Sequence, residues 1–154
     1  MNNLNLKNIA EELLDTFLEA GKIAKEISHR GVKITIKADK SPVTDGDLAV
    51  DKILKDKKEA MEKGLLEAFS DTKAKWSSPK GGCYTWFEMT DGTDISEVRN
   101  EVFNRGVGYI AGDMFAPNGD GQNMARLCFA FEPVKKNYEG IIELASIFKD
   151  LKVI

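Results

Sequence analysis

The spacing of apolar residues changes partway along the chain, and this change constrains the fold more than any other feature. Residues 5–30 carry apolar side chains three and four positions apart, which predicts an amphipathic helix. The same spacing returns over 47–69 and stays in phase through the charged segment 55–59, which predicts one long helix. Later segments alternate apolar and polar residues between glycine-rich turns, a pattern typical of strands.

Short signals mark where the first elements begin and end. Gly31 follows the first helix and suits a left-handed C-cap. Residues 32–36 alternate as a half-buried strand, and a turn with proline follows it. Thr44 with Asp47 three positions later fits a capping box, which would start the long helix.

The remaining sequence predicts a small sheet with helices. The expected elements are strands at 83–89, 107–110 and 125–131, a short helix at 94–104 and a final helix after Pro133. In the last strand, Leu127, Phe129 and Phe131 are expected to share the inward face. The predicted class is α+β: an N-terminal helix with a short strand or hairpin, a long linking helix, and a small antiparallel sheet packed with helices.

Composition excludes several classes of function. The chain has 154 residues and a formal net charge of −3, without the basic excess of a nucleic-acid binder. No apolar run approaches the ~20 residues of a membrane-spanning helix. The first seven residues lack the basic start and apolar core of a secretory signal, so the cytoplasm is the expected compartment.

The cysteines and the histidine are not obvious reactive residues. Cys83 and Cys128 stand in apolar surroundings and are interpreted as small buried hydrophobes, ahead of a disulfide or a nucleophile. His29, the only histidine, is expected at the surface near a helix C-terminus. A multi-histidine metal site or a Ser-His-Asp triad would need residues that are scarce here.

A first resemblance lies near the N-terminus. Residues 37–51, KADKSPVTDGDLAVD, resemble the K-A-D-x-S-P-V-T-x-A-D-x-A-V-E/D segment of the inositol monophosphatase family. Those enzymes are magnesium-dependent phosphomonoesterases, and the resemblance implies that Thr44 and Asp47 lie near Mg²⁺. A capping box alone is the alternative. The family's G-E-E segment is absent, and residues 88–93, EMTDGT, are interpreted as a turn at Asp91 and Gly92 and not as its D-P-x-D-G-T metal segment.

A second resemblance covers residues 58–151 through four motifs in order. They are WSSPKGGCYTWFEMTDGTD at 76–94, GVGYIAGDMF at 106–115, GDGQNMARLCFA at 119–130 and YEGI at 138–141. These are similar to segments of the C-terminal small domain of class I/II aminotransferases, fold-type I enzymes that use pyridoxal phosphate. The subgroup with 2-aminoadipate, kynurenine and multiple-substrate aminotransferases is the most similar.

This resemblance implies a role for Arg126. The arginine of the family's R-L-x-F motif binds the α-carboxylate of the amino-acid substrate, and a planar guanidinium suits that bidentate contact. The alternative is an arginine on the solvent face of an edge strand. The family also implies an amino acid and a 2-oxo acid as substrates, and a homodimer.

The two resemblances together predict a fusion. Residues 1–57 would be an inositol-monophosphatase-like fragment, joined near 55–58 to an aminotransferase small domain at 58–154. In aminotransferases the Schiff-base lysine, its acid partner and the phosphate cradle come from a preceding large domain. We therefore expect a family-level aminotransferase without transaminase activity in this polypeptide by itself. The alternatives are a magnesium-dependent phosphomonoesterase of the inositol-phosphate type and a non-catalytic interaction module or remnant.

Overall fold

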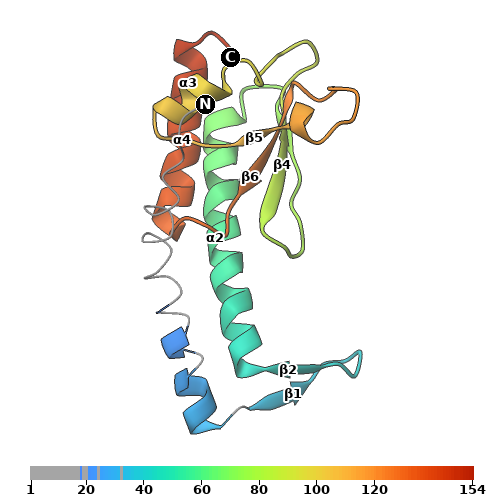
Figure 1. Cartoon of the computed structure of the whole chain (residues 1–154), viewed down its shortest axis with the longest axis vertical. Helices are drawn as coiled ribbons and strands as arrows, with labels where there is room; N and C mark the ends of the chain where they lie inside the picture. The colour runs from blue at the N-terminus through green and yellow to red at the C-terminus, as the bar shows by residue number, and fades with distance from the viewer. Residues whose placement is uncertain (1–17, 19–20, 24, 32) are drawn as a thin grey trace. The chain divides into compact units, whose positions relative to one another are not determined.

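The computed structural model describes residues 18, 21–23, 25–31 and 33–154 (Figure 1). The chain consists of two compact units, Met1–Asp51 and Lys52–Ile154. Most of the predicted first helix lies outside the described residues, but residues 21–23 and 25–30 are helical. Gly31 ends this helix with a φ of +83°, which confirms the predicted left-handed cap. His29 is exposed, as expected.

A small hairpin follows in the first unit. Strand β1 (Ile34–Ile36) pairs antiparallel with strand β2 (Pro42–Thr44). The strand was predicted as half-buried, but Ile34 and Ile36 are 62% and 63% exposed. The alternation therefore predicted the strand correctly, but the predicted burial was wrong. Burial requires a second layer of structure against the apolar face of the strand.

Helix α2 (Asp45–Phe69) runs without interruption through the charged segment. It begins with the predicted capping box: the Thr44 N–H donates to Asp47 Oδ2 over 2.9 Å, and the Asp47 N–H donates to Thr44 Oγ1 over 3.1 Å. Charged residues in its middle form pairs four positions apart, such as Lys52–Asp56 at 2.6 Å. These pairs let a polar segment remain helical without a buried face.

The second unit contains a four-stranded antiparallel sheet in the order β3-β4-β6-β5. Its strands are β3 (Lys75–Trp76), β4 (Tyr84–Glu88), β5 (Ile110–Ala111) and β6 (Met124–Cys128). Strand β3 was not predicted, and β5 is shorter than the predicted 107–110. The helices are α3 (Arg99–Asn104), the 3-10 turn η1 (Gly112–Met114) and α4 (Val134–Asp150). Helix α3 starts later than predicted, because Asp94 caps a turn before it.

The core of this unit lies between the sheet and two helices. Helix α4 and the C-terminal part of α2 lie side by side (Figure 1), and Gly64 of α2 allows the close approach to Ile141 of α4. Phe69 packs edge-on against Phe87 of β4 and Phe148 of α4. The arrangement confirms the predicted α+β class with a small antiparallel sheet.

Three burial predictions were wrong. Phe131 is 65% exposed, because β6 ends at Cys128 and the alternation does not continue through the bend that follows. Cys128 is exposed on the outward face of β6, and Cys83 is only half-buried. Both thiols are free. None of the described helices is long and apolar enough to cross a membrane.

Two glycines bring the ends of the 112–123 loop together. A Cβ on Gly112 would lie 2.5 Å from the carbonyl oxygen of Gly121 and 2.8 Å from Cβ of Met124. Gly121 itself has a φ of +87°. This crossing holds the loop against the start of β6.

We predict that Gly112→Ala lowers the free energy of unfolding by roughly 1–3 kcal/mol, since backbone must move to admit the methyl group. Gly140→Ala is the matched control, because nothing lies within 4 Å of a Cβ at that helical position. The control should be neutral or stabilising by up to ~1 kcal/mol. Urea unfolding of both variants measures the difference; equal stabilities would contradict the close contact.

Candidate functional site

The outward face of the sheet carries a cluster of aromatic residues and one arginine. In β4, Thr85 and Phe87 point into the core, so Tyr84 and Trp86 point outward. Arg126 pairs with Trp86 across the β4–β6 register and shares this outward face. Strand alternation therefore keeps the arginine out of the core and places it among aromatic rings.

The guanidinium of Arg126 lies near two aromatic rings. Its central carbon is 4.2 Å from the ring centre of Tyr84 and 4.7 Å from that of Phe115, which follows η1. Trp86 supports Phe115 edge-on, with ring centres 5.6 Å apart. Each cation–π contact is worth ~0.5–1 kcal/mol at an exposed position and more when desolvated. Tyr84 and Phe115 therefore flank the cation, and Trp86 supports Phe115.

The arginine lacks an anionic partner in the described part of the chain. No hydrogen bond or ion pair joins its guanidinium to another described residue, and its Nε is shielded from solvent without an acceptor. A shielded donor without an acceptor costs ~1–3 kcal/mol, and more when it is charged. Unlike Nε, the terminal nitrogens Nη1 and Nη2 are not shielded from solvent, and they have no hydrogen-bond partner among the described residues. They are the donors that a carboxylate could reach.

A hollow of about 910 Å³ adjoins Arg126. Its apolar lining includes Tyr84, Phe131 and Leu144. Its charged lining comprises Arg105, Arg126, Lys136, Glu132, Glu139 and Glu143. Arg105 differs from Arg126 because it is already paired, with Glu101 at 2.9 Å and Asp150 at 3.1 Å. In this hollow the candidate binding group is therefore Arg126.

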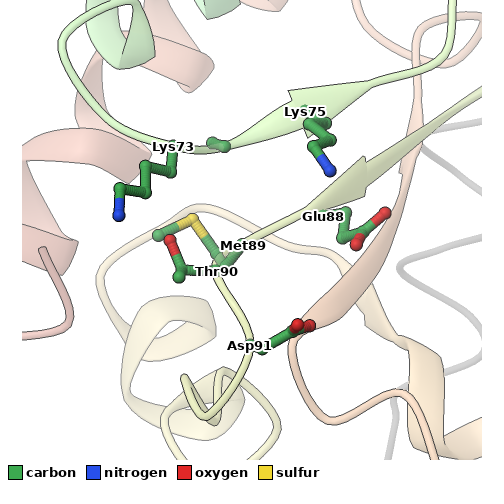
Figure 2. Close-up of a pocket in the computed structure, with 7 residues that line it drawn as sticks. Lys73, Lys75, Glu88, Met89, Thr90 and Asp91 are labelled. Carbon is green, nitrogen blue, oxygen red and sulfur yellow. The ribbon is translucent and has the colours of Figure 1, made fainter.

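A second hollow of about 520 Å³ lies where β3 begins and β4 ends, and it has mixed charge (Figure 2). Lys75 and Glu88 come from paired positions of the two strands, and Asp91 follows in the turn. Gly92 has a φ of +85°, and the Thr93 N–H donates to the Thr90 carbonyl, so EMTDGT contains the expected turn. The opposite charges that line this hollow select for no single class of ligand.

The residues proposed for magnesium do not meet in a metal site. Asp47 accepts hydrogen bonds from the backbone N–H and the hydroxyl of Thr44, which lower the pKa of the Asp47 carboxyl. Among the residues that the structure describes, no three His, Cys, Asp or Glu side chains gather as a metal site would need. The described structure therefore supports the capping role of Thr44 and Asp47 and offers Mg²⁺ no ligand set.

The lysines do not fit a Schiff-base site for pyridoxal phosphate. Such a lysine is activated by burial or a neighbouring cation. Lys73, Lys80 and Lys149 each follow a serine by three positions, as in the family's S-x-x-K pattern, but all three are exposed. None of the lysines in the described part of the chain is buried. We therefore assign no step of cofactor chemistry to these residues.

Sequence reasoning selected Arg126 but not the two rings that contact it. The alternation of β4 could have placed Tyr84 on the same face of the sheet as Arg126, because β4 and β6 are neighbouring strands. Phe115 is the last residue of the motif at 106–115, but nothing in that motif indicated a contact with Arg126. Its approach depends on the Gly112–Gly121 crossing, which is a contact between distant positions.

Comparisons with known proteins point to aminotransferases. No family model matches the chain. Over 96 residues, 62% of the chain, it is 34% identical to aromatic-amino-acid aminotransferase 1 of Thermococcus litoralis, of which it covers 23%. The chain spans about a quarter of the length of the curated relatives it matches.

Solved structures agree with this similarity. Kynurenine aminotransferase of Pyrococcus horikoshii, solved with PMP, matches 65% of the chain with a TM-score of 0.60 and 32% identity, over 24% of its own length. LysN, the α-aminoadipate aminotransferase of Thermus thermophilus, was solved with N-(5'-phosphopyridoxyl)-L-leucine. It matches 67% of the chain with a TM-score of 0.60 and 25% identity, over 26% of its length. About two thirds of this chain is therefore homologous to aminotransferases.

Arg126 is expected to contribute little to stability, because its ring contacts are offset by an unsatisfied Nε. We predict that Arg126→Met, which keeps a long side chain, changes the free energy of unfolding by less than ~1 kcal/mol. Leu127→Ala, at the buried neighbouring position, should cost about 2–5 kcal/mol. Denaturant unfolding of both variants compares them. A loss in Arg126→Met as large as that in Leu127→Ala would show that the arginine is structural.

Proposed function

We propose that this chain supplies the substrate-carboxylate-binding part of a pyridoxal-phosphate-dependent aminotransferase. Arg126 would bind the α-carboxylate of an amino acid or 2-oxo acid. The observation that carries the proposal is the guanidinium held against Tyr84 and Phe115 without an anionic partner among the described residues. The homology over about two thirds of the chain supports it, since the matched proteins are aminotransferases.

The shape of the guanidinium suits a planar anion such as a carboxylate. A guanidinium forms two parallel hydrogen bonds with a carboxylate, which fix its direction as well as its position. The adjoining hollow has an apolar lining that would accept the substrate's side chain. The hollow's other described arginine, Arg105, already has two carboxylate partners and would not compete.

Pyridoxal phosphate enters this proposal only as the cofactor of the aminotransferase family, and no binding site for it is proposed in this chain. When bound, pyridoxal phosphate supplies the electron sink for amino-group transfer. None of the described lysines is buried, so they do not offer it a Schiff-base site. We therefore propose that these 154 residues bind a substrate carboxylate but do not catalyse transamination alone.

We predict that phenylpyruvate, a 2-oxo acid with an aromatic side chain, shifts the amide NMR signals around Arg126. Arg126→Met should weaken this binding about tenfold or more, because the charged hydrogen bonds are lost. Arg126→Lys should retain part of it, since a lysine keeps the charge but not the fork.

Two controls distinguish the carboxylate contact from non-specific binding of the aromatic ring. The first control is Arg105→Met. Arg105 lines the same hollow but is already paired with two carboxylates, so its replacement should not change phenylpyruvate binding. Phenethylamine carries the ring without a carboxylate and should cause no comparable shift. Equal binding of phenylpyruvate by the native chain and Arg126→Met would overturn the proposal.

We further propose that residues 1–57 derive from a different protein than residues 58–154. The division into compact units at Asp51 and Lys52 supports this, as does a match that covers 62% of the chain. The resemblance of residues 37–51 to the inositol monophosphatase family suggests the source. Sequencing the coding DNA across 51–58 from an independent clone tests the junction: an uninterrupted aminotransferase reading frame in its place would refute the fusion.

A further inference from the structure

Arg126 is contacted by rings from two separate segments of the chain. Tyr84 comes from β4, and Phe115 comes from the loop between η1 and β6. An arginine side chain loses rotamer freedom when it binds a ligand, and this entropy opposes binding. Rings 4.2 Å and 4.7 Å from its central carbon restrict that freedom before any ligand arrives.

The two rings are held in different ways. Tyr84 is part of a regular strand, so its place follows from the sheet register. Phe115 lies in a loop and needs other supports. Its N–H donates to the Gly112 carbonyl over 2.9 Å, and Trp86 packs edge-on against its ring.

The loop that carries Phe115 is also tied to its surroundings. Asp113 forms an ion pair with Arg99 of α3 at 3.0 Å. Gly112 and Gly121 cross at a distance that no Cβ could occupy. Phe115, which these contacts hold in place, is nevertheless 46% exposed. The contacts therefore position its ring without burying it in the core.

We propose that Phe115 is a positioning residue that orders the Arg126 guanidinium for carboxylate binding. The inference rests on the proposed function for its biological meaning, but the ordering of the guanidinium can be measured without a ligand. Phe115 acts through Arg126 and does not itself contact the carboxylate.

The test replaces the ring while keeping an apolar side chain. Phe115→Leu should weaken phenylpyruvate binding about three- to tenfold, the range expected for loss of one cation–π contact with its ordering effect. Phe115→Tyr keeps the ring face and should bind within about twofold of the native chain. Phe131→Leu is the control for the mobility of Arg126 and not for binding, because this exposed phenylalanine lines the hollow but makes no cation–π contact with Arg126.

A second readout reports on the arginine directly. The Nε–H of Arg126 is shielded from solvent, so its NMR signal and relaxation can be followed without ligand. The native chain, Phe115→Tyr and Phe131→Leu should show a rigid Nε–H, and Phe115→Leu a mobile one. The free energy of unfolding should be similar in all four proteins.

The two readouts separate the possible outcomes. Unchanged mobility in Phe115→Leu overturns the inference, as does unchanged binding when the native chain binds phenylpyruvate. If mobility rises but the native chain binds no carboxylate, the proposed function fails while the ordering of Arg126 by Phe115 stands. Loss of both rigidity and affinity, restored by tyrosine, supports the inference.

Discussion

The packing of Phe69 is the contact on which the second unit depends. This residue ends α2, is fully buried, and meets Phe87 of β4 and Phe148 of α4 edge-on. It therefore joins the long helix, the sheet and the final helix at one point. Because this cluster occupies the inward face of the sheet, the opposite face of the same strands is left for Arg126.

The two faces of the sheet follow different physical rules. On the inward face, apolar side chains fill space and their burial stabilises the fold. On the outward face, Arg126 keeps its charge beside Tyr84 and Phe115, with a shielded donor left unsatisfied. A chain optimised only for stability would pair or replace such a donor. The homology to aminotransferases and this local cost both support the binding role that we propose for the outward face.

The accuracy of the sequence predictions followed the range of the interactions involved. The capping box of Thr44 and Asp47, the cap at Gly31 and the long helix depend on residues within a few positions, and all were predicted correctly. Burial at Cys128 and Phe131 was predicted wrongly, because it depends on where β6 ends and on what covers it. Strand β3, with two residues, is too short to show a period.

The sequence by itself determined the α+β class and the long helix, because periodicity and caps are local properties of the chain. It also identified Arg126 as the candidate binding residue, because the residues of its motif are adjacent in sequence. Only the tertiary structure decided what surrounds that arginine. The ring of Phe115 reaches Arg126 because Gly112 and Gly121 cross and Asp113 pairs with Arg99. Such contacts join positions far apart in sequence, and no local pattern encodes their distances.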